Sequence, residues 1–180
     1  ALTTANGVKC WGWNGDGQLG DGTQTYRTTA VDVVGMTSGV DSIAAGNQHS
    51  CAVVLGGGAK CWGANSFAQL GDGTTTRRLT AVDVSGLTSG VMTIAADSAG
   101  YFSCAVTTGS GAKCWGSNGY GQLGDGTTTD RPNPVKLTLP SGAKVVRMSP
   151  GTGFTPAIIA VAGLLETWCW GKNDKGQCGQ

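Results

Sequence analysis

Short runs of alternating apolar and polar residues recur along the chain, each bounded by glycine, asparagine, aspartate or serine. Runs of four to six residues with such boundaries are typical of β-strands. No window carries an i, i+3, i+4, i+7 apolar stripe free of glycine, which an amphipathic helix would need. The pattern therefore predicts an all-β chain. The runs that return in matched copies are 30–33 with 81–84, 40–44 with 91–95, and 50–53 with 103–106.

A longer motif repeats on a period slightly above 50 residues. The tripeptide Cys-Trp-Gly begins at Cys10, Cys61, Cys114 and Cys169, with spacings of 51, 53 and 55 residues. In three copies it opens the pattern Cys-Trp-Gly-x-Asn-x-x-x-Gln-Leu-Gly-Asp-Gly-Thr, and the fourth copy is partial. About four strands in every ~50 residues is the signature of a β-propeller blade. We divide the chain into repeats at approximately 1–51, 52–104, 105–159 and 160–180, the last incomplete.

This motif resembles the repeat of the regulator of chromosome condensation (RCC1) family, and the resemblance covers essentially the whole chain. Full-length members of that family form seven-bladed propellers. The resemblance therefore implies that residues 1–180 are a partial RCC1-like β-propeller, an arc of about three and a half blades. An open arc exposes strand edges at both ends, so we expect self-association through them.

Residues that agree between the copies are assigned to structure. The asparagine caps a turn, the leucine and the tryptophan pack in the core, and the aspartate bonds an arginine six residues later. The loop has a superficial likeness to a calcium loop, but one recurring carboxylate per copy is too few ligands. These positions are Asn14, Asn65, Asn118 and Asn173; Leu19, Leu70 and Leu123; Trp11, Trp62, Trp115 and Trp170; and the pairs Asp21–Arg27, Asp72–Arg78 and Asp125–Arg131.

Four cysteines are spaced to form two disulfides. Cys51 and Cys61 flank a glycine-rich turn, as do Cys104 and Cys114. A hairpin centred on each turn sets the cysteines opposite each other, with Cα atoms ~4.5–5.5 Å apart, within disulfide reach. The rival, a zinc site, needs closer ligand spacing and more histidine than His49 supplies. We therefore expect two disulfides, no metal, and an oxidising setting that is extracellular or at the cell surface.

The other three cysteines find no partner by this rule. The same ten-residue spacing places the partner of Cys10 one residue before Ala1, and the partner of Cys169 at Ile159. Cys178 stands where other copies have leucine. We therefore expect Cys10, Cys169 and Cys178 to be free or externally paired, and the chain to be a piece of a longer propeller.

Composition narrows the range of functions. Charged residues make up 13% of the chain, the net charge is +1, and no lysine- or arginine-rich run occurs. Nothing here attracts nucleic acid or anionic lipid, and no apolar stretch approaches the ~20 residues of a membrane helix. His49 precedes Ser50, but neighbours in a strand point to opposite faces. We expect no enzyme activity, no cofactor, no nucleic-acid partner and no membrane insertion.

The function we predict is that of a non-catalytic protein-binding propeller of a secreted or cell-surface protein. One alternative is a structural repeat of a large extracellular or fibre-forming protein. Another, implied by the resemblance, is guanine-nucleotide exchange on a small GTPase. The family resemblance also supplies a precedent for inhibition by binding, in secreted bacterial propellers that block β-lactamases. A fold shared this widely does not decide among them.

Contacts with a partner are expected where the copies diverge, because packing explains the positions that agree. Aromatic and arginine side chains on loops are common anchors of protein interfaces. Two extra residues between Ile94 and Cys104 mark a further loop, where we expect one ring to turn inward and its neighbour to face solvent. The alternative is that divergent positions are merely unconstrained surface. The candidate binding residues are Trp13, Asp16, Tyr26, Phe67, Arg77, Tyr101, Phe102 and Tyr120.

Overall fold

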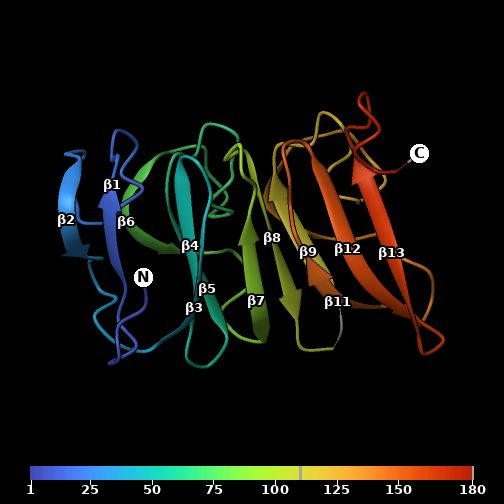
Figure 1. The fold of residues 1–180 in the computed structure, drawn as a ribbon, viewed down its shortest axis with the longest axis horizontal. Coiled ribbons are helices and arrows are strands. Elements are labelled where there is room, and N and C mark those ends of the chain that lie inside the picture. The colour runs from blue at the N-terminus through green and yellow to red at the C-terminus, as the bar shows by residue number, and fades with distance from the viewer. Residues whose placement is uncertain (110, 180) are drawn as a thin grey trace.

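Four antiparallel sheets stand side by side in an open arc (Figure 1). This computed structural model describes residues 1–109 and 111–179, so Ser110 and Gln180 lie outside the described residues. Across those two ranges the chain forms strands, turns and bends, and no helix. The prediction of an all-β partial propeller is therefore confirmed.

Each sheet is one blade, and the two middle blades are complete. Strands pair with their neighbours in chain order. The first blade contains β1 (Lys9–Gly12) and β2 (Arg27–Asp32); the second β3 (Val40–Ala45), β4 (His49–Val54), β5 (Gly58–Gly63) and β6 (Arg78–Asp83); the third β7 (Val91–Ala96), β8 (Phe102–Thr107), β9 (Ala112–Gly116) and β10 (Arg131–Lys136); and the fourth β11 (Lys144–Met148), β12 (Phe154–Val161) and β13 (Leu164–Gly171).

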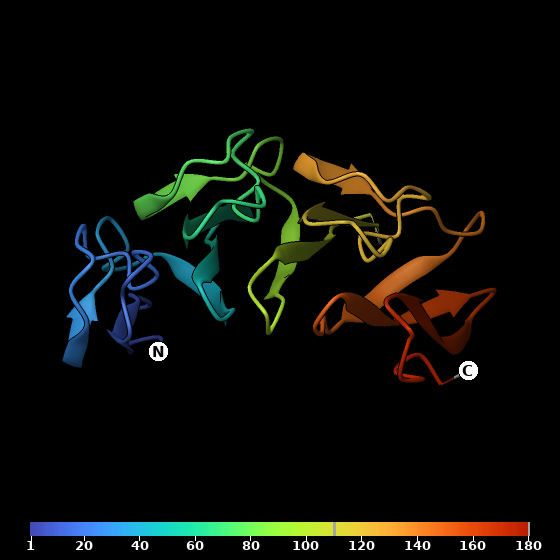
Figure 2. The ribbon, with the colours of Figure 1, turned by 90° about the horizontal axis from the view of Figure 1, so that it is seen from above.

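The arc is curved, with β6 and β10 on its convex side and the opposite edges of the same sheets on its concave side (Figure 2). The repeat boundaries drawn from the sequence, 51/52, 104/105 and 159/160, fall inside β4, β8 and β12. A sequence repeat is therefore out of phase with a blade. Among the described residues β13 has no strand on its outer side. Self-association through such edges stays a prediction.

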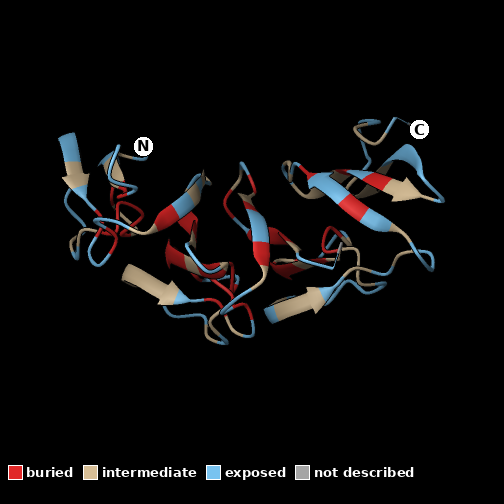
Figure 3. Cartoon of the chain, turned by 90° about the horizontal axis from the view of Figure 1, so that it is seen from below, coloured by how far each residue is buried: buried red, intermediate tan, exposed pale blue. Residues whose placement is uncertain are grey.

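The core lies between blades rather than within one. Leu70 and Val84 of the second blade are fully buried against Ile94, Ala105 and Trp115 of the third. The middle strands β4, β5, β8 and β9 are mostly buried, and further buried residues lie in the loops, whereas β2, β6 and β10 are intermediate or exposed (Figure 3). Because apolar burial is the main favourable term in folding, each blade depends on its neighbour for stability.

One polar arrangement recurs at every junction. The carbonyl of Gln18 accepts hydrogen bonds from Trp62 Nε1 and from Ser50 Oγ of the next blade, both at 2.9 Å. The same carbonyl position in the later copies accepts from Trp115 at 2.9 Å and from Trp170 at 2.8 Å. These tryptophans are core residues as expected.

Trp11 departs from the expected core role. Its side chain is 55% exposed, whereas Trp62 and Trp115 are 1% and 0% exposed. Trp62 Nε1 donates to the Gln18 carbonyl of the preceding blade, and no described residue offers Trp11 a carbonyl in this way. A tryptophan in this motif is buried by the preceding blade, and so its burial depends on that blade.

Two disulfides join the cysteines expected from the hairpin spacing, Cys51–Cys61 and Cys104–Cys114, each with Cα atoms 4.1 Å apart. In both cases the two residues are direct cross-strand partners in the hairpin.

The prediction for the fourth blade was wrong. The β12–β13 hairpin sets Cys169 opposite Pro156 rather than Ile159, because its strands are longer and its turn tighter. Cys169 is joined instead to Cys178, with Cα atoms 5.4 Å apart. Of the three cysteines expected to lack a partner in the chain, Cys10 alone is free.

Candidate protein-binding face

The long loop after the third strand of each blade is held by a buried asparagine. Asn14 is fully buried, and its amide donates to the carbonyls of Thr23 and Thr25 and to Asp21 Oδ1, at 3.0–3.1 Å. Its Oδ1 accepts from the Leu19 N–H at 2.9 Å. Asn65 and Asn118 make the same bonds one and two blades later.

The aspartate of the motif is paired as expected. Arg78 Nε donates to Asp72 Oδ2 at 2.8 Å, and Thr74 donates to Oδ1 of the same carboxylate. Burial acts to raise the pKa of Asp72, but the hydrogen bonds from Thr74, Arg78 and Asn65 outweigh it and hold the pKa below its usual value. These contacts fix each loop as a rigid platform.

All of these loops emerge at one end of the strands. His49 at the start of β4 is the cross-strand partner of Gly63 at the end of β5, so the β3–β4 connection and the long loop lie together. We call this end the loop face, and it is the upper edge in Figure 1. The loop face comprises residues 13–26, 46–48, 64–77, 97–101, 117–130, 149–153 and 172–179.

The loop face brings together seven of the eight candidate binding residues with their side chains at least partly exposed. Asp16 and Arg77 are among them, Asp16 being the less exposed of the two. The aromatic members are Trp13 at 70% exposure, Tyr26 at 65%, Tyr120 at 59%, Phe67 at 43% and Tyr101 at 42%. The eighth, Phe102, is fully buried.

The position held by Asp16, Phe67 and Tyr120 contacts the next blade in every copy. Asp16 Oδ1 lies 3.7 Å from Arg77 Nε. The Phe67 ring packs edge-to-face on Tyr101, with centroids 5.0 Å apart. Lys172 Nζ lies 5.3 Å from the Tyr120 ring centroid, a cation–π distance. Sequence divergence at this position therefore reflects neighbour-specific contacts between blades as well as free surface.

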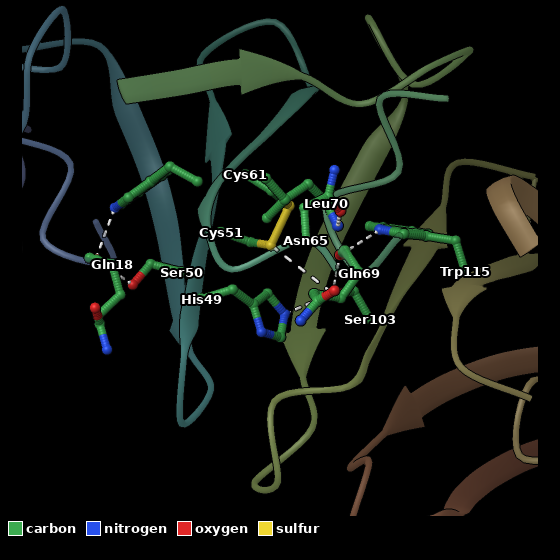
Figure 4. The surroundings of a disulfide bond; sticks show 11 residues. Gln18, His49, Ser50, Cys51, Cys61, Asn65, Gln69, Leu70, Ser103 and Trp115 are labelled. Atoms are coloured by element: carbon green, nitrogen blue, oxygen red, sulfur yellow. Dashed lines mark hydrogen bonds between the residues drawn. A yellow bond between two sulfur atoms is a disulfide. The ribbon is translucent and has the colours of Figure 1, made fainter. Parts of the chain in front are cut away.

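His49 has a structural position that the sequence comparison did not single out. Its ring is fully buried beside the Cys51–Cys61 disulfide, and Nε2 lies 2.8 Å from Ser103 Oγ of the third blade (Figure 4). The available signal was that Phe102 and Phe154 occupy the same place in later copies, facing Gly116 and Gly171 as His49 faces Gly63.

The concave side carries a hollow of about 700 Å³. It is lined mainly by small and apolar residues of β3, β7 and β11, such as Ala44, Ile94 and Met148, with Arg147 as its charged member. No group of three or more metal-ligating side chains occurs within residues 1–109 and 111–179. In the same ranges no helix is long and apolar enough to cross a membrane.

The motif that builds these loops matches a known repeat. The model of the regulator of chromosome condensation (RCC1) repeat matches residues 8–53 and 114–158, and a second model of that repeat matches 40–69. The chain belongs to the RCC1 repeat family. The human protein named probable E3 ubiquitin-protein ligase HERC4 is 32% identical over 187 residues, which cover 99% of this chain and 17% of HERC4.

Solved structures of RCC1-like propellers share the fold. Human WBSCR16 superposes with a TM-score of 0.81 at 25% identity, covering 99% of this chain and 46% of that chain. Prp20p from Saccharomyces cerevisiae, whose structure is described with its binding to Gsp1p and histones, gives a TM-score of 0.78 at 18% identity, covering 97% and 43%. This RCC1 repeat chain thus spans less than half the length of each of these three proteins.

Proposed function

We propose that this chain is a non-catalytic protein-binding module of a secreted or cell-surface protein, and that the loop face contacts the partner. The observation that carries the proposal is the gathering of five aromatic side chains, 42–70% exposed, at one end of the blades. Large exposed aromatic side chains on a rigid platform are suited to act as interface anchors. The binding of Gsp1p and histones described for Prp20p adds support by family likeness.

The charges of the loop face indicate the chemistry of the partner surface. The arginines of the motif are bonded to Asp21, Asp72 and Asp125 of the same loops, and Arg77 lies beside Asp16. Lys172 lies beside Asp174, and Asp130 accepts from the Asn118 N–H, so among the described loop-face side chains Lys175 is an exposed charge without an ion-pair partner. Because most of the charges are paired, the exposed aromatic rings are left as the main contact groups. We therefore expect a partner surface that is apolar at its centre, and binding that changes little with salt.

The proposed setting rests on the cysteines. The sulfurs of Cys51–Cys61 and Cys104–Cys114 are buried at the junction cores, with residue exposures of 0–1%. Disulfides persist in oxidising compartments and are rare in the reducing cytosol. Three disulfides in 180 residues support an extracytoplasmic location.

The experiment compares two matched surface variants. The first replaces Trp13, Tyr26 and Tyr120 of the loop face by serine. The control replaces Leu55 and Leu164 by serine, because these are 61% and 70% exposed at the opposite end of the strands. Both variants and the wild type are immobilised and exposed to proteins of the organism that makes the chain, at 50 mM and 500 mM salt.

The proposal predicts that a protein captured saturably by the wild type is retained by the opposite-end control and lost from the loop-face variant, at either salt concentration. Equal capture by both variants would place binding elsewhere. If the wild type captures no protein saturably, the binding proposal fails and the structural-repeat alternative is favoured.

A further inference from the structure

His49 occupies an aromatic slot that the later blades fill with phenylalanine. Phe102 and Phe154 stand at the same register position, and Phe102 is fully buried. The imidazole of His49 is equally buried at the junction of the second and third blades. The ionisable ring of His49 therefore occupies a buried position that a phenylalanine ring fills in the later blades.

The hydrogen bonds fix which ring nitrogen carries the proton. Ser103 Oγ donates its single hydrogen to the Gln69 carbonyl at 2.9 Å, so it can only accept from His49 Nε2, 2.8 Å away. Nε2 therefore bears the hydrogen and Nδ1 bears the lone pair. Nδ1 is buried and has no hydrogen-bond partner among the described residues. Protonation would thus create a buried N–H and a buried charge at Nδ1.

The segment packed against His49 is loop 97–101, which carries Tyr101. A Cβ atom on Gly46 would lie 3.0 Å from His49 Nδ1 and 2.8 Å from the carbonyl oxygen of Asp97. The His49 ring and loop 97–101 are therefore both packed closely against Gly46. Gln69 connects the ring to the loop. Its side-chain Nε2 donates to the Gly100 carbonyl at 2.9 Å, and its backbone carbonyl accepts a hydrogen bond from Ser103 Oγ. His49, Ser103, Gln69 and the loop form one connected network.

Burial lowers the pKa of His49 to about 4, and the backbone of Gly100 offsets only part of this effect. The other charged groups on the surrounding segments are already engaged. Lys60 of β5 is bonded to Asp83, Asp72 is bonded to Arg78, and Asp97 accepts from the N–H groups of Ala99 and Tyr101.

Asp97 cannot be the source of acid sensitivity. Burial raises the pKa of Asp97 above its usual value. A carboxyl group whose pKa is higher in the folded state gains protons more readily there, so acid favours the folded loop through Asp97. The pKa of His49 is shifted the other way, so acid disfavours the folded junction through His49.

We infer that His49 is an acid-sensitive element of the fold: protonation of its ring places a buried charge and an unpartnered N–H at Nδ1 against loop 97–101 and opens that loop, uncovering Tyr101 and the second-to-third blade junction. Water can reach the charged ring once the loop has opened. The consequence for partner binding, that acid releases a partner held on this part of the loop face, rests on the proposed function. The opening itself does not.

The experiment measures hydrogen exchange of the free protein at pH 7.0 and 4.5, corrected for intrinsic exchange. From the shifted and ordinary histidine pKa values, the opening constant of loop 97–101 should rise on the order of fifty-fold. Loop 149–153 cannot serve as the control, because Thr152 is hydrogen-bonded to Ser98 of the opening loop. The internal control is the β12–β13 turn at residues 162–163, which lies at the opposite end of the strands and should stay unchanged. His49→Phe should abolish the rise, whereas Asp97→Asn should retain it.

A second measurement needs no variant. His49 is the one histidine in the chain, so its ring signal in an NMR titration is unambiguous. The inference requires that this signal titrate well below the usual histidine range. The rise in hydrogen exchange of loop 97–101 must occur over the same pH range. Titration near pH 6.5, or a rise in exchange that is the same in His49→Phe as in wild type, would overturn it. Neither outcome would bear on whether the loop face binds a protein.

Discussion

The backbone carbonyl of Gln69 accepts the indole hydrogen of Trp115 at 2.9 Å, across the junction of two blades. The same relation joins Gln18 to Trp62 and Gln122 to Trp170. Each copy of the motif thus supplies both partners. Its glutamine carbonyl contacts the following blade, and its tryptophan contacts the preceding blade. The repeat specifies an interface between neighbours rather than a self-contained unit.

Replacing Gly71 by alanine should open the junction under Trp115. Gly71 has φ +68°, and a Cβ there would lie 2.7 Å from the Trp115 ring. Overpacking and the left-handed backbone together should cost about 2–4 kcal/mol in the free energy of unfolding. Gly86→Ala is the matched control, since Gly86 has φ +66° with no atom within 4 Å, and should cost about 1 kcal/mol. Equal losses in urea unfolding would show that close packing on Trp115 is not involved.

Asp72→Asn should make the free energy of unfolding depend less on pH in the acid range. The pKa of Asp72 is held below its usual value, so its contribution is present above the unfolded-state pKa and is lost as the pH falls toward the folded-state pKa. The variant should be less stable than wild type at pH 7, and the difference should shrink as the pH falls below the ordinary aspartate range. Urea unfolding from pH 7 to 2.5 provides the measurement. Asp83→Asn, which removes an exposed partner of Lys60, should change the curve little; a matching change there would contradict the assignment.

Much of this organisation is predictable from sequence because the repeat exposes it. The Cys51–Cys61 register follows from hairpin symmetry about a glycine turn, and the Asp72–Arg78 pair from its recurrence at one spacing. The Cys169 partner could not be found this way, because the fourth hairpin is longer and sets Pro156 opposite Cys169. Cys178 in the leucine position was the signal of a different pairing.

The candidate site was predictable only as a set of divergent positions. Sequence comparison could not show that Asp16, Phe67 and Tyr120 each contact the following blade, because their partners come from non-equivalent positions. The buried role of His49 was hidden for a related reason. From the sequence, His49 was considered only as a zinc ligand and as the neighbour of Ser50, and its correspondence to Phe102 did not by itself show that the position is buried at a junction between blades.

Thiol counting in denaturant should find one free cysteine, Cys10. Burial raises the pKa of the Cys10 thiol, so alkylation of the folded protein at neutral pH should be slow compared with the denatured chain. Peptide mapping should recover Cys169 linked to Cys178. Three alkylated cysteines in the denatured, unreduced chain would instead show that Cys169 and Cys178 are free thiols, contrary to the disulfide between them.

Removing one buried disulfide should weaken the blade without abolishing the fold. Cys51→Ala with Cys61→Ala releases a ten-residue crosslink, which should cost about 2–3 kcal/mol by loop entropy. The effect is measured by urea unfolding under non-reducing conditions. A reductant should then lower the stability of wild type more than that of the double variant, and an equal loss in both would argue against this crosslink.

Mutation of Tyr101 and mutation of Phe102 should have very different effects on the free energy of unfolding. Phe102 is fully buried, so Phe102→Ser should cost about 3–5 kcal/mol in unfolding free energy. Tyr101 is 42% exposed and rests on Phe67, so Tyr101→Ser should cost no more than about 1 kcal/mol. Thermal unfolding of both single variants tests this, and similar losses would mean that Tyr101 serves the core rather than the surface.

Site-specific photo-crosslinking tests the loop face as the binding surface most directly. A photoreactive phenylalanine analogue replaces Tyr26 or Tyr120 on the loop face, and Leu55 or Leu164 at the opposite end, each being at least 59% exposed in the folded chain. The account predicts that the partner captured by wild type is crosslinked from Tyr26 or Tyr120 and from neither leucine position. Crosslinks that form mainly from Leu55 or Leu164 would contradict it.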